Sequence, residues 1–221
     1  MSTSPVPIDI VVFDLGGVVV RICRSIAEAA ARVNLPVDPI LAQPEYIAQR
    51  RALHRDYERG LLTCDQFFDR IAATTRGMYT PAQFRALHEA WIIDEYAGVG
   101  DLIDDLHRVN MPTGALSNTN ASHWAQMSHA ADRPAIFAAP ARLRHRHASH
   151  LLGLAKPDAA IYHAFARETG FIPNRIVFFD DLAENIQAAQ AAGWNAHQID
   201  HTGDTAAQMR AILCTSHGIR L

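Results

Sequence analysis

Four polar positions stand where an apolar run gives way to a turn or a helix. Asp14, Ser117 and the pair Asp180–Asp181 each close a short apolar run, and Lys156 lies just before a helical pattern. Ligands of an open parallel sheet bind beyond the carboxyl ends of its strands, so we expect these groups to converge on one site. A carboxylate can act as a nucleophile, a hydroxyl and an ammonium can hold an anion, and further carboxylates can hold a hard cation.

The elements that must position these groups alternate between strand and helix patterns. Short apolar runs predict strands over 8–15, 112–118, 135–139, 175–181 and 194–200. Helical patterns lie between them over 99–110, 157–170 and 182–193. This alternation predicts an α/β fold in which helices cover both faces of a parallel sheet.

One long segment interrupts the alternation. Four helical patterns follow one another there without a strand pattern, over 24–34, 44–60, 64–77 and 81–92. Thr63 and Gln66 have the spacing of a capping box, and Thr80 before Pro81 marks another helix start. We therefore predict a core made of residues 1–22 and 96–221, with an all-helical cap, 23–95, inserted after the first strand.

The four polar segments, in this order, resemble the four motifs of the haloacid dehalogenase superfamily. They read VVFDLGGVV, GALSNTN, GLAKPDAAIY and VFFDDLAEN. The runs SNTNASHW, SHLLGLAKP and FFDDLAENI are similar to the subgroup that contains bacterial α-D-glucose-1-phosphate phosphatase and the phosphatase domain of soluble epoxide hydrolase. The resemblance covers nearly the whole chain. It implies a Rossmann-like core with a helical cap and Mg²⁺-dependent hydrolysis of a small phosphate ester, with a sugar phosphate as the expected substrate.

The resemblance also implies a nucleophile and a metal site. Asp14 is the expected nucleophile, and it would form an aspartyl-phosphate that water then hydrolyses. The expected Mg²⁺ ligands are Asp14, Asp181 and the backbone carbonyl of Gly16, with Asp180 as an outer or occasional ligand. Asn185 takes a place often held by a second Asp, where it can orient a ligand but adds no charge.

The phosphate is expected to be held by Ser117 Oγ, the backbone N–H of Asn118 and Lys156. A carboxylate that approaches a phosphate dianion is repelled. Each pair of unit charges about 4 Å apart costs about 4 kcal/mol at an effective dielectric constant near 20. Lys156 and Mg²⁺ would offset this repulsion, so the chemistry requires the cations that the resemblance implies.

The first segment departs from the family pattern at Gly16. Most phosphatases of the superfamily read Asp-x-Asp-Gly there, and the second Asp protonates the leaving oxygen. Three alternatives stay open: a phosphatase whose leaving group needs little acid assistance, a metal-free 2-haloacid dehalogenase in which Asp14 displaces halide from carbon, and a non-catalytic or regulatory protein. The acidic pair Asp180–Asp181 suits a cation and favours the phosphatase.

Three groups of basic side chains have less specific patterns. His123 is the best candidate for a substitute acid, although a helix-capping or surface role is simpler. A histidine group over 145–150 includes two alternate residues that would share one face of a strand and bind zinc; an exposed connection is the simpler interpretation. The basic stretch over 50–55 faces either the phosphate or solvent, and the solvated helix face is the ordinary interpretation.

The composition excludes several classes of function. A net charge of −3 gives no electrostatic reason to expect nucleic acid as a partner. The three cysteines, Cys23, Cys64 and Cys214, are too far apart for a disulfide framework and suit a reducing compartment. The first ten residues lack the basic region of a signal peptide, and no apolar run reaches the roughly 18 residues of a membrane span. We therefore expect a cytoplasmic protein with a small-molecule substrate and no membrane or protein partner.

Overall fold

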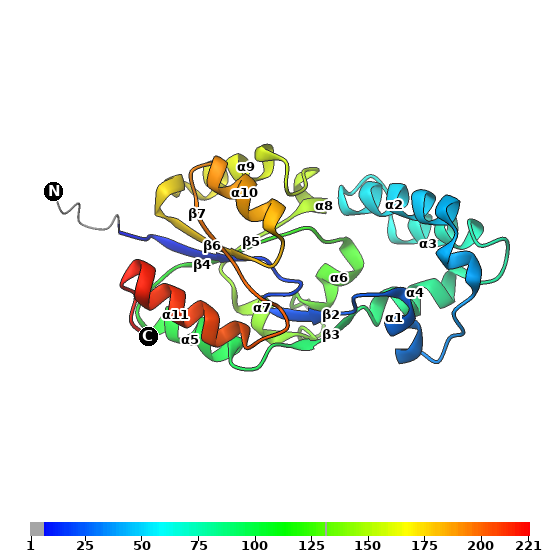
Figure 1. The fold of residues 1–221 in the computed structure, drawn as a ribbon, viewed down its shortest axis with the longest axis horizontal. Helices are drawn as coiled ribbons and strands as arrows, with labels where there is room; N and C mark the ends of the chain where they lie inside the picture. The colour runs from blue at the N-terminus through cyan, green and yellow to red at the C-terminus, as the bar shows by residue number, and fades with distance from the viewer. Residues whose placement is uncertain (1–6, 131) are drawn as a thin grey trace.

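A five-stranded parallel sheet lies at the centre of the computed structural model, which describes residues 7–130 and 132–221 (Figure 1). The strand order is β5-β4-β1-β6-β7. The strands span β1 Ile10–Phe13, β4 Thr113–Ser117, β5 His145–Ala148, β6 Ile176–Asp180 and β7 Asn195–Gln198. The three central strands are buried on both faces, which explains their continuous apolar runs and confirms the predicted α/β class.

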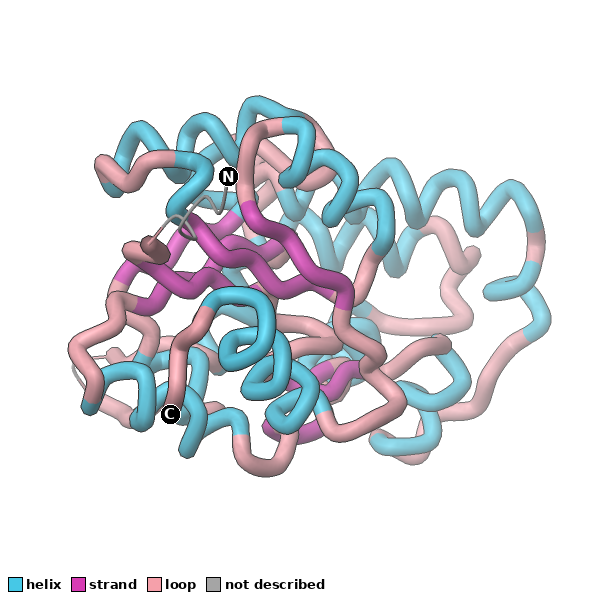
Figure 2. Tube along the Cα trace, turned by 60° about the vertical axis from the view of Figure 1, so that its left-hand side comes forward, coloured by secondary structure: helices cyan, strands magenta, loops and turns pink. Residues whose placement is uncertain are grey.

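Helices cover the two faces of this sheet (Figure 2). Val11 and Phe13 of β1 pack on the face covered by α5 Val99–Arg108, α7 Ala138–Arg142 and α11 Thr205–His217. Ile10 and Val12 pack on the opposite face, which is covered by α9 Ala159–Thr169 and α10 Ala183–Ala191. Alternate side chains of one strand therefore enter two separate cores.

The inserted segment forms a helical body beside the carboxyl end of the sheet (Figure 1). It contains α1 Ile26–Arg32, the 3₁₀-helix η1 Pro39–Ala42, α2 Pro44–Glu58, α3 Cys64–Ala73 and α4 Pro81–Glu89. The predicted capping box of Thr63 and Gln66 is present, and Thr80 caps α4 in the same way with Gln83. An aromatic core that includes Tyr57 and Phe67 holds these helices together.

The expectation that residues 23–95 contain no strand is wrong at their end. β3 Ile92–Glu95 pairs antiparallel with β2 Val20–Ile22, so a two-stranded ribbon joins the cap to the core. The partner strand lies about seventy residues earlier in the chain, so tertiary pairing and not a local pattern makes the strand. The boundaries 1–22, 23–95 and 96–221 remain predictions.

Two expectations for residues 135–150 are also wrong. The run 135–139 is not a strand: its last residues enter α7, and Phe137 is buried at the helix N-cap. The segment interpreted as an exposed connection contains the edge strand β5. Its His-Arg-His sequence contains no apolar run, so no strand pattern is visible there. The side chains pack on aromatic rings instead: the Arg146 guanidinium lies 4.3 Å from the centroid of the Trp124 ring, and the His147 ring packs on Phe165.

The shorter helices complete the core. They are α6 Ala121–Gln126, α8 Ser149–Leu152 and the 3₁₀-helix η2 Pro173–Arg175. None of the helices within 7–130 and 132–221 is both long and apolar enough to cross a bilayer. The expectation that no targeting sequence is present rests partly on residues 1–6, which lie outside the described residues.

Candidate active site

The carboxyl ends of β1, β4 and β6 bring the predicted polar residues together. Asp14 follows β1, Ser117 ends β4, Asp180 ends β6 and Asp181 follows it. All four residues are buried, with exposed fractions of 9% or less. The Asp14 N–H donates to the carbonyl oxygen of Phe179 at 2.8 Å, which fixes the end of β1 against the end of β6.

Lys156 lies between two of these carboxylates. Its Nζ is 2.8 Å from Asp14 Oδ1 and 2.6 Å from Asp180 Oδ2, and its side chain is 1% exposed. Burial disfavours the charged ammonium, but the two carboxylates outweigh it and raise the pKa of Lys156. Burial also raises the pKa of Asp14 to about 6, against the lowering effect of Lys156. At neutral pH the pair is therefore a carboxylate beside an ammonium.

Asp180 is the centre of the polar network. It accepts hydrogen bonds from Asn185 Nδ2 at 3.0 Å, from the Leu182 N–H at 2.9 Å and from Lys156. Asn185 therefore orients a carboxylate, as the sequence suggested. The contacts also give Asp180 a larger structural role than that of an occasional metal ligand.

The acidic residues fit a hard cation. One carboxylate oxygen from each of Asp14, Asp180 and Asp181 lies within 4.8 Å of the others. Three buried carboxylates so close together repel one another, and Mg²⁺ prefers such oxygen ligands. Gly17 has φ +87° and packs so closely that an added Cβ would lie 2.4 Å from Asp181 Oδ2. The glycine turn is thus shaped around the acidic cluster, and the residues present fit Mg²⁺.

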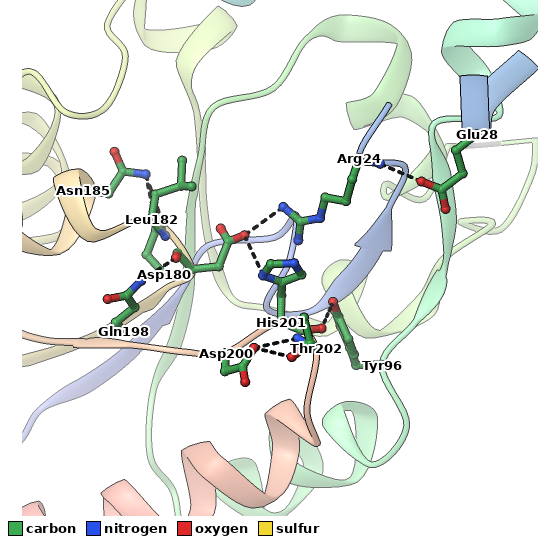
Figure 3. Close-up of polar contacts among 11 residues, drawn as sticks. Arg24, Glu28, Tyr96, Asp180, Leu182, Asn185, Gln198, Asp200, His201 and Thr202 are labelled. Atoms are coloured by element: carbon green, nitrogen blue, oxygen red, sulfur yellow. Dashed lines mark hydrogen bonds and ion pairs between the residues drawn. The ribbon is translucent and has the colours of Figure 1, made fainter. Parts of the chain in front are cut away.

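Two basic side chains reach Asp181 from other parts of the chain (Figure 3). Arg24, just beyond β2, is 3.0 Å from Asp181 Oδ2, and His201 Nδ1 is 3.9 Å from the same oxygen. The Arg24 N–H also donates to Glu28 at 2.8 Å. Sequence reasoning missed Arg24 and His201, since neither stands in a motif and each is far from Asp181 in the chain.

Asn118 fixes the loop that carries Lys156. Its Nδ2 donates to the Lys156 carbonyl oxygen, and its Oδ1 accepts from the Lys156 N–H, both at 2.8 Å. The side chain of Asn118 thus joins the second and third sequence segments. Its predicted part in phosphate binding uses the backbone N–H instead, so the two roles do not compete.

The sequence of residues 8–193 matches the family of haloacid dehalogenase-like hydrolases. The chain belongs to this family. Among solved structures, it is similar to the HAD family enzyme BT-2542 of Bacteroides thetaiotaomicron, with a TM-score of 0.77, 25% identity, and coverage of 92% of this chain and 99% of that one. BT-2542 has also been solved in complex with magnesium and inorganic phosphate, at 24% identity and a TM-score of 0.75.

The chain is similar to two further proteins. An HAD-like family hydrolase of Porphyromonas gingivalis has a TM-score of 0.76 at 22% identity, over 94% of this chain and 98% of that one. The phosphatase MT3486 of Mycobacterium tuberculosis (strain CDC 1551 / Oshkosh) is 39% identical over 57 residues. That match spans 26% of this chain and 26% of the relative.

A cavity of about 360 Å³ separates the core of this hydrolase from its cap. Gly16, Ser117 and Asn118 line its core side. Three residues of the basic stretch on α2, namely Arg50, Arg51 and His54, line the cap side. Arg51 is exposed, so the interpretation of that stretch as a solvated face is wrong only for the partly buried Arg50 and His54. Arg55 lines a neighbouring cavity together with Lys156.

His123 lines the cavity, but its ring is already engaged. Its Nε2 lies 2.7 Å from the carbonyl oxygen of His88, and its Nδ1 lies 3.3 Å from Asn120 Nδ2. These partners suit a neutral ring with the proton on Nε2, and burial lowers the pKa of His123 to about 4. A neutral ring with its N–H committed to a carbonyl is a poor proton donor, which argues against His123 as the substitute acid.

The histidines of β5 give no zinc site. Among the described residues, the acidic cluster is the one group of three or more such side chains placed to hold a metal ion. His147 Nε2 lies instead 3.3 Å from Glu168 Oε2, and His145 packs edge-on against Phe171.

Proposed function

We propose that this hydrolase is a Mg²⁺-dependent phosphatase that cleaves a small phosphate monoester through an aspartyl-phosphate on Asp14. The observation that carries the proposal is the buried cluster of Asp14, Asp180 and Asp181 around Lys156. The magnesium and phosphate bound by BT-2542 and the phosphatase activity named for MT3486 support it. The cytoplasm is the compartment we propose, on the cysteine pattern.

In this mechanism, a carboxylate oxygen of Asp14 attacks phosphorus while the bond from phosphorus to the leaving oxygen breaks. The leaving oxygen departs with the electron pair and takes a proton. Water then attacks the aspartyl-phosphate, which releases phosphate and restores Asp14. Lys156 neutralises Asp14 and the phosphoryl oxygens, and Ser117 Oγ and the Asn118 N–H donate to those oxygens. Mg²⁺, held by Asp14, Asp181 and the Gly16 carbonyl, would supply further positive charge against the phosphate.

The absence of a side chain at Gly16 restricts the leaving group. With no acid beside the leaving oxygen, the oxygen must depart with little protonation, so a more acidic leaving group reacts faster. Sugar 1-phosphates, which leave through the anomeric oxygen, and aryl phosphates both meet this requirement. A primary alkyl phosphate, such as a sugar 6-phosphate, does not.

The two other functions left open by the sequence are less well supported. A metal-free dehalogenase has no need for three carboxylates within 4.8 Å of one another. A non-catalytic protein has no need for a buried Lys156 ion-paired with Asp14. Burying these charges lowers stability, and a protein without catalytic activity gains no function from them.

A screen for released phosphate and released halide separates these functions. The purified protein is incubated with sugar 1-phosphates, aryl phosphates, acyl phosphates, nucleotides and 2-haloacids, with Mg²⁺ and after exhaustive chelation. We expect phosphate release that requires Mg²⁺. Halide release that survives chelation would support the dehalogenase, and no turnover of any substrate would support the non-catalytic protein.

A further inference from the structure

One face of α2 forms a polar stripe along the cavity. The stripe consists of Tyr46, Arg50, His54 and Glu58, which follow one another at intervals of four residues and all line the cavity. Residues four apart lie on the same side of a helix. Glu58 also lines the neighbouring cavity with Asn118 and Lys156, so this end of the stripe is nearer the catalytic residues.

Two polar atoms of the stripe have no hydrogen-bond partner among the residues that the structure describes. Tyr46 Oη and Arg50 Nε are buried without a hydrogen bond. Arg50 also forms no ion pair with the residues of 7–130 and 132–221. A buried donor without a partner costs free energy, and a cation in a cavity attracts an anion. The stripe therefore lacks an anionic or acceptor group, which a ligand can supply.

His54 does not compete with Arg50 for that group. Burial lowers the pKa of His54 to about 4, and the nearby Arg50 charge lowers it further, so the ring is neutral at pH 7. Arg50 is then the cation of the stripe at neutral pH, and it is less exposed than Arg51, which also lines the cavity.

Part of the cavity lining, here called the apolar wall, consists of apolar side chains. It is formed by side chains of β2, α3 and α4 and of the segments beside them, namely Ile22, Phe67, Ile71, Phe84, Leu87 and Trp91. A hexose leaving group would bury several hydroxyls against this wall without hydrogen-bond partners, which costs free energy for each hydroxyl. An aromatic ring fills such a space without that cost and gains from burial of its apolar surface.

We propose that the leaving group of the substrate is an aromatic alcohol whose far end carries a carboxylate, with the ring against the apolar wall and the carboxylate on Arg50. The phosphate end of this inference rests on the proposed function. A phenolic oxygen is also the acidic leaving group that the glycine at position 16 requires. The cavity volume of about 360 Å³ suits a ligand with one aromatic ring and a short side chain.

The test compares three phosphate esters as ligands. They are 4-(carboxymethyl)phenyl phosphate, 4-methylphenyl phosphate and glucose 1-phosphate, and the first two have leaving oxygens of nearly equal acidity. Dissociation constants are measured by calorimetry on the Asp14→Asn variant with Mg²⁺, in which the esters stay intact. We expect the carboxymethyl ester to bind about tenfold or more tighter than the methyl ester, and glucose 1-phosphate to bind weakest.

Arg50→Gln in the same background is expected to reduce the gap between the two aryl esters to about twofold or less. Arg70→Gln, at an exposed position on α3 of the cap, serves as the matched control and is expected to keep the gap. A gap that survives Arg50→Gln would overturn the role of Arg50. Glucose 1-phosphate binding as tightly as 4-methylphenyl phosphate, or no binding of any ester, would overturn the aromatic leaving group.

The wild-type protein separates this inference from the proposed function. If the esters bind in the expected order but wild-type protein with Mg²⁺ releases no phosphate from them, the phosphatase fails and the cavity remains an aryl-anion site. If phosphate is released but the order of binding is reversed, the phosphatase stands and this inference fails.

Discussion

The core end of the site and the cap face differ in whether their buried polar groups have partners within the protein. At the core end, Lys156 contacts both Asp14 and Asp180, and Asn185 donates to Asp180. On the cap face, Tyr46 Oη and Arg50 Nε are buried without a hydrogen-bond partner within 7–130 and 132–221. The core end therefore pairs its buried Lys156 with carboxylates of the protein, whereas Arg50 on the cap face is left for another molecule to pair.

This difference divides the proposed work of the enzyme between two regions. Because the core end is preorganised, the geometry of attack at phosphorus is the same for every ester that reaches it. The cap face is completed only by a leaving group, so it decides which ester is retained. Variants at the core end should abolish turnover of all substrates, while variants of the stripe should change the ranking of substrates.

The largest effect is expected at Asp14. Asp14→Asn removes the proposed nucleophile and should lower phosphate release by on the order of 10³-fold or more, while the fold is retained. Steady-state phosphate release on every active ester measures this loss, with Asp101→Asn, at an exposed position on α5, as the control. Release within about tenfold of wild type would contradict the assignment of the nucleophile.

The variants Asp181→Ala and Asp180→Ala should lose different properties, the first Mg²⁺ affinity and the second stability. Asp181→Ala should lower Mg²⁺ affinity and turnover by about 10²-fold, since the site loses a carboxylate ligand. Asp180→Ala should instead lower the free energy of unfolding by about 3–5 kcal/mol, because the buried Lys156 loses one of its two partners. Calorimetric titration with Mg²⁺ and denaturant unfolding distinguish the two losses. Equal Mg²⁺ affinity of Asp181→Ala and wild type would remove Asp181 from the metal site.

The core end could be predicted from the sequence because its residues follow strands. Asp14, Ser117 and Asp180 each close an apolar run, and parallel strands bring their carboxyl ends to one edge. Arg24 could not be found in this way: it is 157 residues from Asp181, and only the packing of β2 brings the two together. Strand β5 was missed for a related reason, since its His-Arg-His sequence is covered by neighbouring rings and carries no apolar signal.

The cap was predictable in its helices but not in its orientation. The capping box of Thr63 and Gln66 has a local cause and is present in the structure. The four-residue spacing of the polar stripe is also visible in the sequence. Which side of α2 faces inward depends on how α2 packs against α3 and against the core, and no local pattern records this.

The two glycines of the first segment should behave differently. Gly17→Ala places a Cβ 2.4 Å from Asp181 Oδ2 at φ +87°, so it should lower Mg²⁺ affinity and turnover by about tenfold or more. Gly16 does not have a positive φ, and the nearest atom to a Cβ there would be Cδ1 of the Ile22 side chain, at 3.2 Å. Gly16→Ala is therefore the matched control and should keep most activity. Equal losses in the two variants would contradict this account of the turn.

The dependence of kcat on the leaving group tests the part of the site where the core end meets the cap face. Without an acid at Gly16, kcat should rise steeply with the acidity of the leaving oxygen, by several-fold per pKa unit, across substituted phenyl phosphates and down to primary alkyl phosphates. A flat dependence would mean that another group protonates the leaving oxygen. Glu58 would then be the residue to replace, since it lines the cavity and burial raises its pKa to about 7.

The smallest expected effect is a pH dependence of the free energy of unfolding, which arises from His54 in the cap. Burial lowers the pKa of His54 to about 4 from an ordinary 6.5. The unfolded chain therefore binds a proton between these pH values that the folded chain does not, so stability falls as the pH drops from 6.5 towards 4. His54→Gln should remove about 1–2 kcal/mol of the stability difference between pH 7 and pH 5, as measured by urea unfolding.

Glu58→Gln is the control for this measurement, because the contribution of Glu58 to stability changes with pH in the opposite direction. Burial raises the pKa of Glu58, so the folded chain holds a proton up to a higher pH than the unfolded chain does, and this contribution to stability is lost as the pH rises through about 7. Identical pH profiles for wild type and His54→Gln would show that the ring is not held neutral in the cap.

The ribbon of β2 and β3 gives the cap a property of its own. The chain leaves the core and returns to it side by side: Val20 pairs with Glu95, and the Cys23 N–H donates to the Trp91 carbonyl oxygen at 2.8 Å. A segment of another length could join these two points without lengthening or redirecting the path of the core chain, provided that it keeps Arg24, which contacts Asp181. The cap is therefore an insert with adjacent ends, and a foreign cap joined between Arg24 and Trp91 would face the same core carboxylates and could select a different leaving group.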